Sequence, residues 1–371
     1  MRILHINSYY GGGLFYKHLY DQQQREGLEI DVYVPAAKAL NPENVDLGDY
    51  TIHSVNHRKY DRYFFHLKHR KILKDVKDKF HIHNYSLVHA HSLFSNGYIA
   101  LKLKKEFGIP YMVAIRNTDV NYFFKYMIHL RKLGVEILKE ADKIICLSEP
   151  YKHTVIETYV PEHLRCKISR KVRVIPNGID SFWFENRSDS KATPPKDHLK
   201  LVYAGVVNKR KNVLTTAKAV ELLQKRGYQV TFTVVGRVED QRVLQKLASL
   251  PYVHYIEQKP KEELINIYHA NDIFVMPSIE ETFGLVYPEA MSQGLPVIYS
   301  KGQGFDGQLD EGVVGYSVTP TSAEEIADRI QAILANFEVL SNHCVNKVDQ
   351  FRWSRISEAY HEQYSQIVGL F

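Results

Sequence analysis

Two carboxylates, Glu281 and Glu289, flank a short segment whose pattern predicts a strand, a loop and a helix. The apolar run 273–276 predicts a buried strand before the loop, and Pro288 suits the first turn of the helix after it. A ligand bound here would lie at the carboxyl end of a strand, where open α/β sheets bind ligands. Each carboxylate offers two acceptor oxygens, which match a pair of sugar hydroxyls. The segment could therefore hold two polyols, one at each glutamate.

Position alone leaves a structural role open for Glu289, because a carboxylate in a first helical turn interacts favourably with the helix dipole. The wider pattern favours function. From Glu281 the chain reads Glu-Thr-Phe-Gly-Leu-Val-Tyr-Pro-Glu-Ala-Met, followed by Ser-Gln-Gly-Leu-Pro-Val-Ile. This segment resembles the donor-binding signature of retaining glycosyltransferases of family 4, which have the two-domain GT-B architecture. The match is specific because it includes both glutamates, the Phe-Gly-Leu between them and the Gly-Leu-Pro after the helix.

The resemblance implies an α/β protein of the GT-B type, with two Rossmann-like domains whose parallel sheets face a central cleft. It implies that Glu281 contacts hydroxyls of the transferred sugar and that Glu289 contacts the ribose of the nucleotide. The sugar would lie against Phe283, Gly284 and Leu285. The donor would be a nucleotide diphosphate sugar, with UDP as the expected nucleotide, and the reaction would use no bound metal or other cofactor.

A basic run, Gly205-Val-Val-Asn-Lys-Arg-Lys-Asn, follows the first predicted strand of the second domain. A departing nucleoside diphosphate develops negative charge, which preorganised cations stabilise without proton transfer. By resemblance, Lys211 occupies the position of the family lysine, whereas Val206 stands where the family has an arginine. Lys209 or Arg210 could supply the missing charge. A solvated basic turn is the alternative for both residues.

Glycine-rich turns after predicted strands complete the expected donor site. The first turn precedes a predicted helix at 14–26, so its backbone N–H groups could approach a phosphate, although a plain strand–helix turn is the alternative. Tyr16 replaces the third glycine of a dinucleotide fingerprint, which argues against a dehydrogenase. By resemblance, the turns contribute these donor-site residues: Gly11, Gly12, Gly13, Gly205, Gly236 and Arg237.

Arg116 and Asp119 lie in a segment that in the family often ends in His-Gly-x-Asp, with the histidine near the transferred sugar. Arg116 occupies the histidine position, and Asp119 keeps the aspartate. Because arginine stays protonated it cannot act as a general base, but its planar guanidinium binds phosphates and carboxylates. We expect Arg116 to contact an anionic group of the donor or acceptor. His91, Asn117 and Asp119 are the expected acceptor-side residues, although His89 or His91 could be structural.

Composition agrees with a cytoplasmic two-domain enzyme. Of 371 residues, 24% are charged and 44% hydrophobic, and no apolar run approaches the roughly 20 residues of a membrane span. The start of the chain predicts a buried strand rather than a signal peptide. The three widely spaced cysteines argue for reduced thiols and against a zinc cluster.

Charge is unevenly distributed along the chain. Residues 1–178 contain 28 lysines and arginines against 18 acidic residues, whereas the remainder contains 20 against 24. Much of the excess lies in segment 57–83, where apolar residues recur at helical spacing: Phe65, Ile72, Leu73, Val76 and Phe80. This basic amphipathic helix predicts docking on an anionic membrane surface. A solvated helix whose apolar stripe faces its own core is the alternative, and no nucleic-acid motif accompanies the charge.

Strands and helices alternate along the chain, which predicts parallel sheets covered by helices. The turn-rich segment 175–180 predicts a domain boundary, with an acceptor-side domain at 1–178 and a nucleotide-sugar-binding domain at 179–353. A helix predicted at 353–368 would return to the first domain, as in GT-B proteins, so 354–371 is assigned there.

These patterns predict a retaining hexosyltransferase that acts on a saccharide or lipid-linked glycan, in cell-surface glycan synthesis at the inner face of the membrane. The alternatives are a GT-B phosphorylase or epimerase and a non-catalytic GT-B subunit that partners a transferase.

Overall fold

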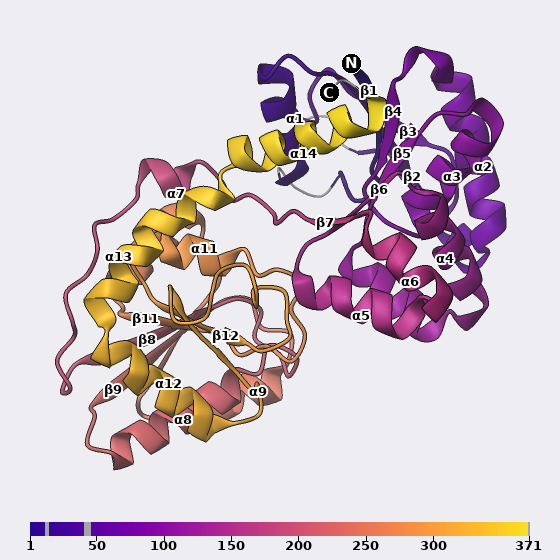
Figure 1. Ribbon diagram of the computed structural model, residues 1–371. Coiled ribbons are helices and arrows are strands. Elements are labelled where there is room, and N and C mark those ends of the chain that lie inside the picture. The colour runs from indigo at the N-terminus through magenta and orange to yellow at the C-terminus, as the bar shows by residue number, and fades with distance from the viewer. Residues whose placement is uncertain (12–14, 41–45, 370–371) are drawn as a thin grey trace. The chain divides into compact units, whose positions relative to one another are not determined.

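The computed structural model describes residues 1–11, 15–40 and 46–369. Its contacts divide the chain into two compact units, and each is described by itself. Unit 1 contains residues 1–147, 151–176 and the segment from Trp353, whereas unit 2 contains residues 148–150 and 177–352. Each unit is built on a parallel sheet covered by helices, as the alternating pattern predicts (Figure 1).

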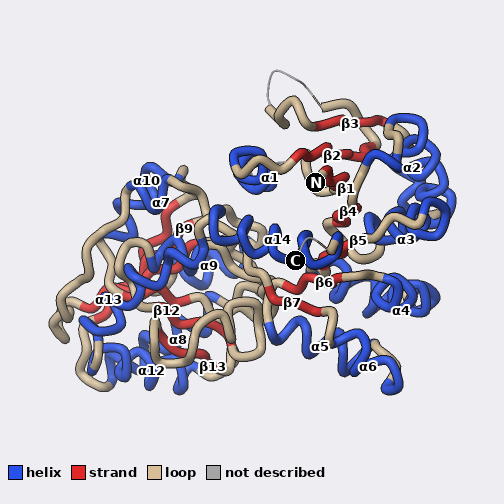
Figure 2. Tube along the Cα trace, turned by 45° about the horizontal axis from the view of Figure 1, so that its top comes forward, coloured by secondary structure: helices blue, strands red, loops and turns tan. Residues whose placement is uncertain are grey.

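Unit 1 has a seven-stranded parallel sheet in the order β3-β2-β1-β4-β5-β6-β7, which can be followed in Figure 2. Its strands are β1 (Arg2–Ile6), β2 (Glu29–Ala36), β3 (Thr51–Val55), β4 (Leu87–Ala90), β5 (Tyr111–Ala114), β6 (Lys143–Cys146) and β7 (Val172–Val174). The order reverses between β1 and β4, which pair with Ile6 opposite Ala90. Such a reversal places a ligand crevice at the carboxyl ends of the two strands.

Helices cover both faces of this sheet (Figure 2). The helices are α1 (Phe15–Arg25), α2 (Phe65–Lys79), α3 (Ser95–Phe107), α4 (Arg131–Glu140), α5 (Glu149–Tyr159), α6 (Glu162–Ser169) and α14 (Trp353–Val368). The shorter segments are η2 (Lys59–Tyr63), η3 (Ile82–Asn84), the π-helical η4 (Asp119–Phe124) and η5 (Ile128–Leu130). Tyr20 of α1 and Tyr364 of α14 belong to the core on one face, and Val76 of α2 and Leu138 of α4 to the core on the other.

The last helix, α14, runs beside α1 and contacts β4, although more than 250 residues separate it from either (Figure 1). Its Ser357 hydroxyl donates to Glu26 at 2.5 Å, and its Tyr364 hydroxyl lies 2.7 Å from Nδ1 of His89. Gln23 donates to the same Tyr364 oxygen at 3.1 Å. The helix therefore completes the core of unit 1.

Unit 2 has a six-stranded parallel sheet in the order β10-β9-β8-β11-β12-β13. Its strands are β8 (Leu199–Ala204), β9 (Val230–Val235), β10 (Val253–Ile256), β11 (Ile273–Val275), β12 (Val297–Ser300) and β13 (Gly315–Val318). Its helices are α7 (Phe182–Glu185), α8 (Val213–Lys225), α9 (Gln241–Ala248), α10 (Lys261–His269), α11 (Val286–Met291), α12 (Ala323–Ala335) and α13 (Phe337–Lys347), with η6 (Val348–Phe351). The order reverses between β8 and β11, so this sheet repeats the Rossmann-like pattern of unit 1.

The apolar stripe of the basic segment faces the core of its own unit. Phe65, Ile72, Val76 and Phe80 are all buried, so this stripe cannot meet a membrane. The apolar stripe packs on the core of its own domain, as the alternative held, whereas docking of the exposed side of this segment on a membrane stays a prediction. None of the helices in the described part of the chain has the length and apolar character of a membrane span.

Candidate functional site

Two loops of unit 2 meet where its strand order reverses. One loop follows β8 and spans 205–212, and the other follows β11 and spans 276–285. Because β8 and β11 are neighbours, the loops lie side by side. The Ile279 N–H donates to the Arg210 carbonyl at 2.8 Å, and the Asn212 side-chain amide donates to the Pro277 carbonyl at 2.9 Å. Asn212 adopts a left-handed conformation with φ of 59°, which asparagine tolerates better than most residues.

Lys211 and Glu281 form an ion pair across these loops, through Nζ and Oε2. Only 14% of the lysine side chain and 10% of the glutamate side chain are exposed. The other carboxylate oxygen accepts the Thr282 N–H at 3.0 Å, and the Gln303 side chain accepts the Glu281 N–H at 2.9 Å. The structure thus joins two residues that the sequence pointed to for different contacts, the phosphate and the sugar.

Glu289 lies in α11, which begins at Val286, two residues before the start expected near Pro288. Its carboxylate has no hydrogen bond or ion pair with the described residues. Burial raises its pKa to about 7, with Asp180 adding to the shift and Lys261 opposing it. Lys261 is itself paired with Asp180 at 2.5 Å. A desolvated carboxylate without partners is unfavourable, and hydroxyl donors from a ligand would relieve that strain.

The loop before α11 owes its shape to Gly284 and Phe283. Gly284 has φ of +81°, and a Cβ there would lie 2.4 Å from the ring of Tyr287. The Phe283 side chain is only 2% exposed and packs against Phe351, with ring centroids 5.7 Å apart. The Phe283 side chain therefore anchors the loop to the core of unit 2. Leu285 is half-buried at the start of the helix.

Gly205, Gly236 and Arg237 line a cavity of about 200 Å³ at the same edge of the sheet, together with Gln258, Lys259 and Val286. A Cβ on Gly236 would lie 1.8 Å from the Gly205 carbonyl oxygen, so the two strand ends approach each other closely only because this residue is glycine. The Arg237 side chain pairs with Glu239 at 2.7 Å.

The two other basic residues of the first loop have exposed side chains. Lys209 and Arg210 are exposed, and Arg210 donates from Nη1 to the Glu280 carbonyl at 3.1 Å. Neither residue has an ion pair with the described part of the chain. Both side chains are free to reorient toward an anion.

In unit 1, Arg116 follows β5 at the carboxyl edge of the sheet. Its Nε donates to the His91 carbonyl at 3.1 Å, and its guanidinium lies 5.7 Å from the ring centroid of Tyr16. No carboxylate of the described residues lies within ion-pair distance of it. Burial acts to lower the pKa of Arg116, but its electrostatic interactions with Tyr16, Tyr360 and Asp119 outweigh burial and raise this pKa, so the guanidinium stays charged.

Asp119 is buried and binds backbone rather than the guanidinium of Arg116. Its carboxylate accepts the N–H groups of Leu93 at 2.9 Å, Phe94 at 3.1 Å and Arg116 at 2.9 Å. Burial raises its pKa to about 6, although these three hydrogen bonds act in the opposite direction. Asn117 is half-buried, and its side-chain carbonyl accepts a hydrogen bond from Asn121. Asp119 thus holds together the ends of two strand–helix turns.

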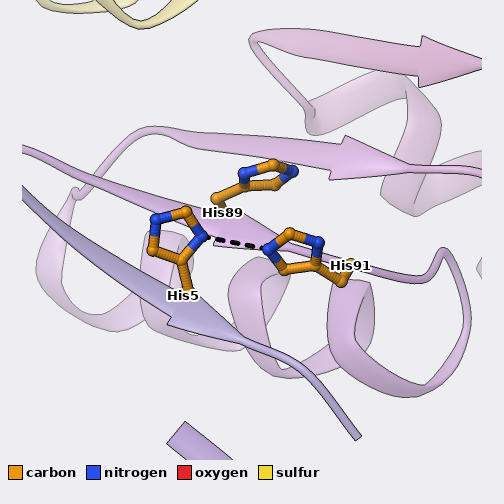
Figure 3. A group of neighbouring side chains, drawn as sticks. All are labelled: His5, His89 and His91. Carbon is orange, nitrogen blue, oxygen red and sulfur yellow. Dashed lines mark hydrogen bonds between the residues drawn. The ribbon is translucent and has the colours of Figure 1, made fainter. Parts of the chain in front are cut away.

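His91 belongs to a buried group of three histidines with His5 of β1 and His89 of β4 (Figure 3). Nδ1 of His5 lies 3.0 Å from Nε2 of His91, and the rings of His89 and His91 stack with centroids 4.0 Å apart. Candidate ligand atoms of the three lie within 4.8 Å of one another, and imidazoles suit zinc. The stacked rings, the shared hydrogen bond and the nearby Arg116 charge favour a neutral hydrogen-bonded cluster instead.

The structure brings the residues of unit 2 that were expected to bind the donor to one edge of its sheet. It brings Arg116, His91, Asn117 and Asp119 to the corresponding edge of unit 1. Gly11 is half-buried and lies beside Leu40. Gly12 and Gly13 lie outside the described residues. Sequence reasoning missed His5 and Gln303, because neither residue lies in a recognisable motif and each meets its partner only through the fold.

Two parallel, Rossmann-like sheets, each with polar residues at its carboxyl edge, are the architecture of the GT-B fold. The model of "Glycosyltransferase Family 4" matches residues 9–181, and the model of "Glycosyl transferases group 1" matches residues 185–348. The two matches together span almost the whole chain. The chain therefore belongs to the group 1 glycosyltransferases with a family 4 N-terminal region, as the resemblance implied.

Known relatives agree with this assignment. The chain is 24% identical to the D-inositol 3-phosphate glycosyltransferase of Corynebacterium jeikeium, covering 96% of this chain and 92% of the relative. Sucrose-phosphate synthase from Thermosynechococcus elongatus superposes with a TM-score of 0.76 at 21% identity, covering all of both chains. HepE from Anabaena, solved in complex with UDP, gives a TM-score of 0.73 at 16% identity, covering 99% of this chain and all of that one. These structures confirm the GT-B fold.

Proposed function

We propose that this glycosyltransferase moves a hexose-type sugar from a nucleotide diphosphate sugar, with UDP as the nucleotide, to a saccharide or lipid-linked glycan. The observation that carries the proposal is the partly buried carboxylate of Glu289, which has no partner among the described residues and lies close to the loop that holds the Lys211–Glu281 pair. HepE, a structural neighbour, was solved with UDP and with UDP-glucose, which supports the choice of nucleotide.

In this proposal Glu289 accepts hydrogen bonds from the two ribose hydroxyls and Glu281 accepts from hydroxyls of the sugar. The cavity lined by Gly205, Gly236 and Arg237 takes part of the nucleotide. Lys211 is held in place by Glu281, so its charge is ready for the diphosphate before the donor arrives. The exposed side chains of Lys209 and Arg210 supply further charge in place of the family arginine.

The proposed transfer retains the configuration of the anomeric carbon. The bond from that carbon to the phosphate oxygen breaks, and the acceptor oxygen attacks the same face. The acceptor proton passes to a phosphate oxygen, while Lys211 stabilises the departing charge. No metal ion or other cofactor takes part in this scheme.

On the side of unit 1, Arg116 binds an anionic group of the donor or acceptor. A guanidinium without a carboxylate partner suits a phosphate or an acidic sugar. The relative named for D-inositol 3-phosphate, a phosphorylated polyol, supports an anionic acceptor. Asn117 contacts the acceptor, whereas Asp119 and His91 position the strand–helix turns that carry the site. A peripheral cytoplasmic location at a membrane, in cell-surface glycan synthesis, belongs to the same proposal.

The test is a thermal-shift screen against UDP-, GDP- and ADP-sugars and the free nucleotides, with Glu289→Ala beside the wild type. Glu262→Ala, which removes an exposed glutamate of α10, is the matched control. A ligand that binds only the folded state raises Tm. We expect a selective shift with UDP-sugars that Glu289→Ala loses and Glu262→Ala keeps. A folded wild type that no nucleotide shifts would overturn the proposal and favour the non-catalytic subunit.

A further inference from the structure

Exposed aromatic and apolar side chains are concentrated on two segments of unit 1. Seven of the twelve exposed large hydrophobic side chains in the described chain lie between residues 59 and 67 or between residues 122 and 128. They are Tyr60, Tyr63, Phe64, Leu67, Tyr122, Tyr126 and Ile128. Tyr63 is 68% exposed, Phe64 63% and Tyr126 65%. Clusters of this kind on one part of a surface indicate an interaction site.

The two segments meet through their buried neighbours. Phe65, at the start of α2, packs against Phe123 of η4 with ring centroids 6.2 Å apart. Phe64 and Tyr122 precede these residues and are exposed, so they flank the same contact. We call the seven exposed side chains the aromatic surface.

Cations accompany the aromatic surface. Arg58, Lys59, Arg62, Arg70 and Lys74 are exposed and have no ion pair with the described residues. Several cations also lie over the exposed rings. The Arg62 guanidinium is 4.8 Å from the ring centroid of Tyr63, and the Lys125 ammonium is 5.4 Å from that of Tyr126. Tyrosine rings flanked by unpaired cations suit the headgroup region of an anionic bilayer.

The aromatic surface lies at the edge of unit 1 where its site residues are found. The sheet is parallel, so segment 59–67, which follows β3, and segment 122–128, which follows β5, both begin at the carboxyl edge. Arg116 also follows β5 at that edge. A bilayer bound here would present its headgroups on the same side of the sheet as Arg116.

We propose that the aromatic surface, with its unpaired cations, docks unit 1 on a bilayer of anionic phospholipids. The aliphatic side chains of Leu67 and Ile128 favour a bilayer over nucleic acid, because they can enter the acyl boundary but cannot stack on bases as rings do. The contact is independent of the buried stripe of α2, which packs inside the unit. Lipid-linked glycans as acceptors, the part that rests on the proposed function, would be reached at this surface.

The test is co-sedimentation of the full chain with vesicles of phosphatidylcholine alone or with 30% phosphatidylglycerol, at roughly 0.1 M and 0.5 M salt. The first variant, Tyr63→Ser/Phe64→Ser/Tyr126→Ser, removes three rings. The second, Arg62→Gln/Arg70→Gln/Lys74→Gln, removes three charges. Matched controls in unit 2 are Val339→Ser for exposed apolar surface and Lys218→Gln/Lys225→Gln for charge. Unchanged Tm shows that each variant is folded.

We expect the wild type and both controls to bind anionic vesicles at low salt and to bind neutral vesicles at least tenfold more weakly. Each triple variant should bind anionic vesicles at least tenfold more weakly than the wild type. The proposal would be overturned if the wild type failed to bind anionic vesicles or bound only RNA or an acidic polysaccharide. It would also be overturned if the variant without the three rings bound anionic vesicles as well as the wild type. Glu289→Gln should bind vesicles like the wild type, so failure of docking and failure of donor binding are separate outcomes.

Discussion

Glu289 combines a partly buried position with the absence of any described partner for its carboxylate. The fold favours its neutral form, because burial raises the pKa from 4.5 to about 7. A residue selected for stability alone would be neutral or paired at this position. The unpaired carboxylate therefore lowers the free energy of unfolding of the ligand-free protein. Binding sites commonly contain such groups.

We predict that Glu289→Gln stabilises the ligand-free protein at pH 8 while it abolishes donor binding. The folded-state pKa is raised, so the wild type loses stability as pH rises from about 4.5 to about 7, and the loss is constant above that. The gain from glutamine should approach about 3 kcal/mol at pH 8 and vanish near pH 4. Urea unfolding of unit 2 across this range measures it, with Glu262→Gln as the control. A gain of equal size at both pH values would contradict the titration argument.

Among the elements, the turn between β11 and α11 depends on one glycine. Gly284 lies where a side chain would meet both an unfavourable positive φ and the ring of Tyr287. Gly227, at the end of α8, has a similar φ of +88° but open space where its Cβ would stand. A side chain at Gly227 would therefore introduce backbone strain alone, whereas a side chain at Gly284 would introduce both backbone strain and a clash with Tyr287.

We predict that Gly227→Ala costs about 1 kcal/mol, the strain of the backbone alone, and that Gly284→Ala costs roughly 2–4 kcal/mol because Tyr287 must also move. Since Tyr287 anchors the loop by donating to the Met276 carbonyl at 2.6 Å, donor binding should fall with Gly284→Ala and stay unchanged with Gly227→Ala. Unfolding and thermal-shift measurements test both. Equal losses in the two variants would show that the Tyr287 contact is not limiting.

Most of the elements that carry the site could be predicted from local patterns. The apolar run 273–276, which contains β11, and the helix at Trp353–Val368 are confirmed, because buried strands and amphipathic helices have local signatures. β3 and β13 lack such a signature, since their sequences, Thr-Ile-His-Ser-Val and Gly-Tyr-Ser-Val, mix polar and apolar residues at sheet edges. The Lys211–Glu281 pair was also missed, because it joins residues 70 positions apart through the neighbouring strands β8 and β11.

At the scale of the whole molecule, the histidine cluster joins distant parts of unit 1. His5 on β1, His89 on β4 and His91 directly after β4 lie together, and Tyr364 of α14 binds His89. Burial lowers the pKa of His5 to about 3 and that of His89 and His91 well below the ordinary value of 6.5. All three are therefore neutral when the unit is folded.

We predict that unit 1 loses stability as pH falls below about 6.5. The unfolded histidines take up protons there and the folded ones do not, so the loss continues toward the folded pKa near 3. Each buried histidine should contribute roughly 2 kcal/mol between pH 7 and pH 5. His5→Asn should lower the steepness of this dependence, whereas His153→Asn, an exposed histidine of α5, should leave it unchanged. Urea unfolding at each pH measures the slope, and a slope insensitive to His5→Asn would contradict the assignment.

The return of α14 to unit 1 also fixes the order in which the protein can be completed on the ribosome. Residues 177–352 are all synthesised before Trp353, so unit 2 can close while unit 1 still lacks its last helix. Until then the sheet face that carries His89 and the side of α1 that carries Tyr20 lack their cover. Unit 1, whose strands are made first, is therefore the last to finish folding, because translation must pass the segment that begins at Trp353 before its core is closed.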